Sequence, residues 1–285
     1  MSNLLVCTLW KGQMDEEGRI SHSEITTYLD CQKKWKLVYQ DHIKLTNPHF
    51  IFGEMAHKVL ETREIPAEEL YPELKEFFGI TNWHNYFTFV LSEIDNFTRD
   101  YEIFGRELRV QNKYIKGIID LVLKKDDKYV LCDYKFSTGI KDYIDLSIDE
   151  QLYIYAMLFA QNYNISLENI EICYISIPKT EIVEPRILMN GKLSKDKGQN
   201  TTYDKYIAKI RELNLKEEDY IDVLSVLKNK EYIHIYKNTL NSKTLLSICE
   251  NVDNILKDMK KGYILEKYSY MCKHCPYFDY CKQEE

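Results

Sequence analysis

Residues 115–136, IKGIIDLVLKKDDKYVLCDYKF, decide the fold of this chain. β-Branched and aromatic residues fill 106–123 and 128–136, a composition typical of strands. The polar run from Lys124 to Lys128 between them is typical of a turn. The stretch therefore predicts an antiparallel hairpin.

Two aspartates and a lysine interrupt this apolar hairpin. Asp120 lies inside the first strand, and Asp133 and Lys135 lie two apart in the second, so the latter pair share a face. Aspartate is depleted in strands, and an unpaired buried charge is costly. A divalent cation would compensate both carboxylates. The alternatives are a buried Asp–Lys ion pair and an edge strand whose polar face is wet.

Helical patterns lie on both sides of the hairpin. Ser21 with Glu24, and Ser147 with Glu150, form capping boxes that predict helix starts. Helices are expected at 21–40, 52–64, 68–79, 83–101, 147–161, 203–213, 216–229 and 241–260, and a further strand at 170–178.

This order of elements predicts an α/β fold with a mixed central sheet flanked by helices. The expected organisation is an N-terminal extension (1–20), a core (21–179), a mostly helical insertion (180–262) and a cysteine-bearing segment (263–285).

Composition limits the functional classes. The formal charge is −7, which argues mildly against nucleic acid as a partner, although carboxylates of an active site contribute to it. No run approaches the ~20 apolar residues of a membrane helix, and Met1 to Trp10 lacks the features of a signal peptide. A cytoplasmic protein with reduced thiols is expected, so the 8 cysteines favour metal or cluster ligation over disulfides.

Three further residues accompany the hairpin motif. His57 lies on the polar side of its helix with Glu54 and Glu61, although a lone helical histidine is more often a surface or core residue. Gln151 and Tyr155 are four apart on one helical face and are able to approach the hairpin, although such a pair more often only packs.

The order of these motifs resembles the RecB-like branch of the PD-(D/E)xK nucleases, which includes AddB-type nuclease domains and the iron–sulfur exonucleases of CRISPR adaptation. The matching motifs are G-x-x-x-H at 53–57, G-x-x-D at 117–120, D-Y-K at 133–135 and Q-x-x-x-Y at 151–155.

The resemblance implies a role for each residue. His57, Asp120, Asp133 and the backbone carbonyl of Tyr134 would bind Mg²⁺ or Mn²⁺, and Lys135 would orient the attacking water. Gln151 and Tyr155 would hold the site and the DNA backbone in register, with Glu54 as a partner for His57.

C-x2-C-x5-C at Cys272, Cys275 and Cys281 is a compact ligand group, and Cys31 is the natural fourth member. The iron–sulfur nucleases show this pattern, which implies a 4Fe–4S cluster that clasps the two ends of the chain. Gln32 departs from the proline that often follows the first cysteine. Four cysteines also suit Zn²⁺, which is the main alternative.

Basic residues give a weaker signal. Lys34 with Trp35, and Lys195 with Lys197, are candidate DNA contacts, although such runs are more often solvated faces. The function expected is metal-dependent DNA hydrolysis, exonucleolytic on single strands or ends, with a helicase, recombination or CRISPR protein as partner. The alternative is a non-catalytic iron–sulfur or zinc module for DNA binding or complex assembly.

Overall fold

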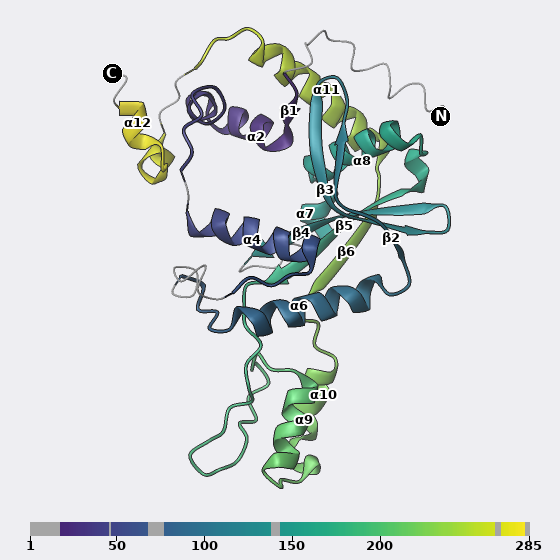
Figure 1. The fold of residues 1–285 in the computed structure, drawn as a ribbon, viewed down its shortest axis with the longest axis vertical. Coiled ribbons are helices and arrows are strands. Elements are labelled where there is room, and N and C mark those ends of the chain that lie inside the picture. The colour runs from purple at the N-terminus through teal and green to yellow at the C-terminus, as the bar shows by residue number, and fades with distance from the viewer. Residues whose placement is uncertain (1–17, 46, 68–76, 138–142, 266–268, 283–285) are drawn as a thin grey trace.

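The structure is a computed structural model that describes residues 18–45, 47–67, 77–137, 143–265 and 269–282. Cys7, most of the expected N-terminal extension and most of the helix expected at 68–79 lie outside these residues. Figure 1 shows a six-stranded sheet with helices on both faces. The predicted α/β class with a mixed sheet is confirmed.

Strand β3 (Ile115–Lys125) organises the sheet, because three strands pair with it. Strand β2 (Glu102–Gln111) runs antiparallel along one edge. The other edge is shared: β1 (Ile20–Ser21) pairs in parallel at its beginning, and β4 (Lys128–Ser137) pairs antiparallel towards its end. Between these two partners, residues 117–120 of β3 have no strand beside them on that edge. The sheet is thus forked at Asp120.

Beyond β4 the sheet continues with β5 (Ile170–Pro178), which is parallel to β4, and β6 (His234–Thr239), which is antiparallel to β5. The strand predicted at 170–178 is confirmed. No strand was predicted after residue 178, because the sequence of β6, HIYKNT, lacks a clear apolar alternation. In the structure β6 is half-buried along most of its length.

The segment 106–123, predicted as one strand, holds parts of two. Residues 112–114 turn the chain between β2 and β3, where the Asn112 side chain accepts hydrogen bonds from the backbone N–H groups of Tyr114 and Ile115, at 2.8 and 2.9 Å. Asparagine stabilises a turn by such local bonds. The hairpin at the Lys124–Lys128 turn is confirmed.

Helices cover both faces of the sheet. One face carries α2 (His22–Asp30), α8 (Glu150–Tyr163) and α11 (Ser242–Met259), whose apolar side chains form one core. The opposite face carries α4 (Pro48–Thr62) and α6 (Trp83–Thr98), which form a second core. Figure 1 shows the two layers above and below the strands.

Two predicted helix boundaries are wrong for local reasons. The helix expected at 21–40 breaks at Cys31, whose backbone is extended, and resumes as α3 (Gln32–Trp35) followed by a π-helical turn, Lys36–Gln40. Helix α8 is capped by Asp149, whose side chain accepts the Leu152 N–H at 2.7 Å, and not by Ser147.

A lobe of residues 180–233 projects from the end of β5 and has its own small core. It contains α9 (Tyr203–Glu212) and α10 (Ile221–Lys228), as Figure 1 shows. The segment 180–262 is therefore not uniform, because β6 and α11 after the lobe join the main sheet and core. The remaining short elements are α7 (Tyr143–Ser147), α12 (Phe278–Lys282) and 3-10 turns at Leu167–Asn169, Glu217–Tyr220 and Tyr270–His274. Among the described residues, no helix combines the length and the apolar character that crossing a membrane requires.

Candidate active site

An imidazole and two carboxylates meet where the sheet forks. His57 comes from α4, Glu107 from β2 and Asp120 from β3. His57 Nδ1 lies 3.4 Å from Glu107 Oε1 and 3.3 Å from Asp120 Oδ1. One ligand atom from each residue lies within 4.8 Å of the others. Such a mixed nitrogen and oxygen set fits a divalent cation, Mn²⁺ and Mg²⁺ in particular.

Glu107 was not anticipated from the sequence. Its neighbours Arg106 and Leu108 pair with Leu121 and Ile119, so Glu107 lies opposite Asp120 across the β2–β3 ladder. Its backbone φ is +46°, a conformation that residues other than glycine seldom adopt, and such outliers concentrate at functional sites.

Glu54, which the sequence suggested as the partner of His57, is exposed. The carboxylates that contact the ring are those of Glu107 and Asp120. Glu54 was considered because it lies on the same helix as His57, whereas Glu107 is fifty residues away along the chain.

Asp133 and Lys135 lie beside this group on β4. Asp133 is 8% exposed, and its Oδ2 is 2.7 Å from Lys135 Nζ. The Lys135 ammonium therefore forms an ion pair with this buried carboxylate. Burial, and then the charge of Asp120, raise the pKa of Asp133 to about 7. A cation beside Asp133 would therefore stabilise its ionised form.

The fork brings β4 into contact with Asp120 through its backbone. The Tyr134 N–H donates a hydrogen bond of 2.7 Å to Asp120 Oδ2. Backbone pairing between β3 and β4 ends at Leu121 and Cys132, just before Asp120 and Asp133. The Tyr134 N–H therefore bonds to the Asp120 carboxylate instead of to the backbone of β3, which holds Asp120 next to Asp133.

The pKa of His57 reflects its two carboxylate neighbours. Burial lowers the pKa of the imidazole, but hydrogen bonds and charges from Asp120 and Glu107 outweigh burial and raise the pKa to about 10. In the absence of metal the ring is therefore an imidazolium at neutral pH. Its positive charge occupies the position where a cation would balance the same carboxylates.

Helix α8 closes the site from the other face of the sheet. Tyr155 is 7% exposed, and its ring packs directly on Gly117, where an added Cβ would lie 2.2 Å from the ring. Burial raises the pKa of Tyr155 to about 12, and hydrogen bonds from the Gln151 side chain and the Ile118 backbone oppose that rise. Tyr155 therefore packs on the hairpin at Gly117 and Ile118 of β3, and Gln151 contacts Tyr155.

A second set of contacts surrounds Lys135. Its Nζ lies 5.2 Å from the centre of the Tyr174 ring, and the Tyr174 hydroxyl donates a hydrogen bond to Asp149 Oδ2. Burial lowers the pKa of Lys135, but the charges of Asp133 and Asp149 outweigh it and leave the pKa above its ordinary value. Lys135 therefore stays charged, and Asp149 connects it to the start of α8.

These groups form the pattern of a nuclease motif: acidic residues on two paired strands, with a lysine two residues after the second. A family model described as the PD-(D/E)XK nuclease superfamily matches residues 19–282. The chain belongs to this superfamily. None of the curated proteins matches it.

Two solved structures are similar to this member of the PD-(D/E)XK superfamily. One is described as a "putative exonuclease" from Eubacterium rectale, with 10% identity and a TM-score of 0.41, and the match covers 93% of this chain and 99% of that chain. The other is described as SSO0001, with 13% identity and a TM-score of 0.34, and the match covers 93% and 87%.

The four predicted ligand cysteines of this nuclease-superfamily chain lie near one another. Cys31 Sγ caps α3 by accepting the Lys34 N–H at 3.4 Å. Burial raises the pKa of Cys281, and the charges of Cys31, Cys275 and Cys272 raise it further. No three of these sulfur atoms lie within 4.8 Å of one another among the described residues.

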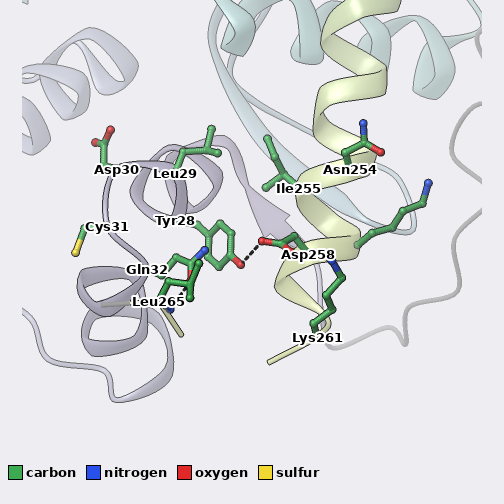
Figure 2. Close-up of a pocket in the computed structure, with 11 residues that line it drawn as sticks. Tyr28, Leu29, Asp30, Cys31, Gln32, Asn254, Ile255, Asp258, Lys261 and Leu265 are labelled. Atoms are coloured by element: carbon green, nitrogen blue, oxygen red, sulfur yellow. Dashed lines mark hydrogen bonds and ion pairs between the residues drawn. The ribbon is translucent and has the colours of Figure 1, made fainter. Parts of the chain in front are cut away.

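The tail reaches α3 through Gln32, whose Oε1 accepts the Leu265 N–H at 2.7 Å. A recess of about 640 Å³ adjoins this contact, between α2 and α11. Figure 2 shows Tyr28 pointing across it to Asp258, with a hydrogen bond of 2.9 Å, and Cys31 at one side. Helices α2 and α3 are therefore in contact with α11 and Leu265 beside Cys31.

The other predicted cysteines and basic residues have varied surroundings. Cys132, Cys173 and Cys249 are buried and belong to the core. Trp35 is 7% exposed and donates to Glu24 at 3.2 Å, so its ring belongs to the core and is not available for stacking on a base. Lys34 lies beside Cys31 at the start of α3. Lys195 and Lys197 are in the lobe, where they contact Tyr220 and Asp222.

Proposed function

We propose that this protein hydrolyses phosphodiester bonds in DNA with Mg²⁺ or Mn²⁺ bound by His57, Glu107 and Asp120. The observation that carries the proposal is the convergence of these three groups next to the buried pair of Asp133 and Lys135. Superfamily membership supports a nuclease, and the ligand set supports a hard divalent cation.

The residues present fit the metal. Asp133 is buried beside Asp120 and is proposed as a further ligand. The Tyr134 carbonyl is proposed as another, because the Tyr134 N–H already contacts Asp120. When bound, the metal polarises the scissile phosphate and lowers the pKa of a water molecule. This role requires His57 to lose its proton, since a ligating imidazole is neutral.

The other side chains act on the substrate and the water. Lys135, charged and held by Asp133 and Asp149, would orient the attacking water and stabilise charge that builds on the phosphoryl oxygens. Gln151 would hold the phenol of Tyr155, and together they keep α8 against β3. We propose exonucleolytic action on single strands or ends, with a helicase, recombination or CRISPR partner, on the basis of the sequence resemblance.

We also propose a structural 4Fe–4S cluster held by Cys31, Cys272, Cys275 and Cys281. What supports this proposal is the C-x2-C-x5-C spacing of the last three cysteines and the resemblance of the sequence to iron–sulfur nucleases. The electrostatic influence of Cys31, Cys272 and Cys275 on Cys281 is consistent with a common site. Hydrolysis requires no electron, so the expected role is to hold the two termini together.

The nuclease proposal is tested on protein purified without oxygen, with end-labelled single- and double-stranded DNA and with Mg²⁺, Mn²⁺ or chelator. Asp133→Ala should abolish metal-dependent cleavage, whereas Asp127→Ala, which removes an exposed carboxylate at the turn of the same hairpin, should retain it. A folded wild-type protein that binds DNA but cleaves none would replace the nuclease with the binding-module alternative.

The cluster proposal is tested separately by metal and sulfide analysis. Wild-type protein should be brown and contain iron and inorganic sulfide, and Cys281→Ser should lose most of both. Cys249→Ser, at a buried cysteine outside the group, should keep its iron. A colourless wild-type protein that contains stoichiometric zinc would exclude the cluster.

A further inference from the structure

The β2–β3 ribbon has one buried and one exposed face. On β3, Gly117 and Ile119 are buried, whereas Lys116 and Ile118 between them are exposed. On β2, Arg109 is exposed and the next residue, Val110, is buried. The buried face packs under α8, so the exposed face is the one that carries Asp120.

The register of the ribbon arranges this exposed face in rows. Arg109 pairs with Ile118, and Gln111 pairs with Lys116. Glu107 and Asp120 form the adjoining row, because their neighbours pair on both sides. Residues paired across a ladder share a face, and successive rows on one face are about 6.8 Å apart. The metal ligands, Arg109 and Lys116 therefore follow one another at steps of about 7 Å.

The two cations of these rows are available for a ligand. Neither Arg109 nor Lys116 takes part in an ion pair within the part of the chain that the structure describes. Glu24, whose carboxylate is close enough to Lys116 for the charge to affect it, is itself hydrogen-bonded to Trp35.

We propose that this face, defined by Arg109, Gln111, Lys116 and Ile118, binds the single-stranded DNA that leads into the metal centre. Arg109 and Lys116 contact successive backbone phosphates on one side of the scissile bond. The rows are spaced like the phosphates of an extended strand, one nucleotide for every two residues. Ile118, 44% exposed and paired with Arg109, offers an apolar surface to a base beside that cation.

This inference deepens the proposed function and rests on it for the position of the scissile bond. The contribution of Arg109 and Lys116 to DNA affinity does not depend on catalysis, because phosphate binding releases counterions whether or not hydrolysis follows. Binding and cleavage therefore test the two proposals separately.

The test uses Arg109→Gln/Lys116→Gln and a fluorescent single-stranded oligonucleotide, with anisotropy measured in EDTA to prevent metal-dependent hydrolysis. The salt slope is the slope of the logarithm of the binding constant against the logarithm of the salt concentration. Each lost phosphate contact reduces its magnitude by about 0.7, so two lost contacts reduce it by about 1.4 and weaken binding roughly ten- to thirtyfold near 0.1 M salt. In the cleavage assay KM should rise similarly, with kcat at saturating DNA retained.

The matched control is Lys125→Gln/Lys128→Gln, which removes the same charge from exposed positions about 30 Å away, at the other end of β3. Its salt slope should remain that of the wild type. Arg109→Lys/Lys116→Arg keeps both charges and should retain most of the affinity. Equal thermal midpoints show that each variant is folded.

Equal losses of affinity in the two double Gln variants, or no loss in Arg109→Gln/Lys116→Gln, would overturn the proposal that this face binds DNA, even if the protein is an active nuclease. If the wild-type protein never cleaves but its binding depends on Arg109 and Lys116, the proposed DNA-binding face stands and the nuclease proposal is overturned. A wild-type protein that binds no oligonucleotide would overturn the DNA-binding face directly.

Discussion

Glu107 and Asp120 face each other across the β2–β3 ladder, and both carboxylates contact the same imidazole nitrogen of His57. Two carboxylates this close repel each other unless a positive charge lies between them. In the structure the protonated His57 supplies that charge, and in the proposed enzyme a divalent cation would supply it.

Glu107→Gln should weaken Mn²⁺ binding about 10- to 100-fold, because an amide is a poorer ligand than a carboxylate and the local charge rises by one. Glu54→Gln, on the helix of His57 but exposed, should change the affinity less than about twofold. Titration calorimetry measures both. Equal affinities for the two variants would remove Glu107 from the metal site.

Metal binding should release protons. The pKa of His57 is raised to about 10, so the ring is protonated at pH 7.5 and must lose its proton to become a ligand. Mn²⁺ affinity should therefore rise by up to about tenfold per pH unit between about pH 7 and 9. Calorimetry in buffers of different ionisation enthalpy measures the protons released. A binding heat that is the same in every buffer would contradict this.

The metal-free protein should lose stability as the pH rises from about 4 to 7. The pKa of Asp133 is raised by burial from its ordinary 3.8 to about 7, so across this range the folded state holds a proton that the unfolded state has released. Asp133→Asn should remove this dependence, on the order of 1–3 kcal/mol. Urea unfolding at several pH values in EDTA measures it. Parallel curves for both proteins would show that Asp133 titrates normally.

Gly117→Ala and Gly53→Ala should shift stability in opposite directions. A Cβ at Gly117 would lie 2.2 Å from the Tyr155 ring, so the ring must move, at a cost of about 1–3 kcal/mol, and cleavage should fall as well. A Cβ at Gly53, within α4, meets nothing within 4 Å, and alanine should stabilise the helix by about 0.5–1 kcal/mol. Thermal unfolding of both variants tests the pair, and a stable Gly117→Ala would mean that Tyr155 does not pack on β3.

Much of the fold could be predicted from local patterns, because the responsible interactions are short in range. The hairpin of 115–136, the strand at 170–178 and the long helices of 83–101 and 241–260 all follow from side-chain periodicity and turn composition. Where a local interaction was misjudged, the prediction failed: the Asn112 turn divides what was expected as one strand, and Asp149 caps the helix assigned to Ser147.

The sequence by itself determined which hairpin residues are candidates for the proposed chemistry: Asp120, Asp133 and Lys135 stand out because charge within an apolar strand requires compensation. Only the tertiary structure decided that Glu107 joins them. Its place depends on the register of β2 against β3 and on a backbone at φ +46°, and neither is visible in residue order. Strand register is fixed by contacts between segments distant along the chain, so Glu107 could be assigned to the proposed metal centre only once the sheet was assembled.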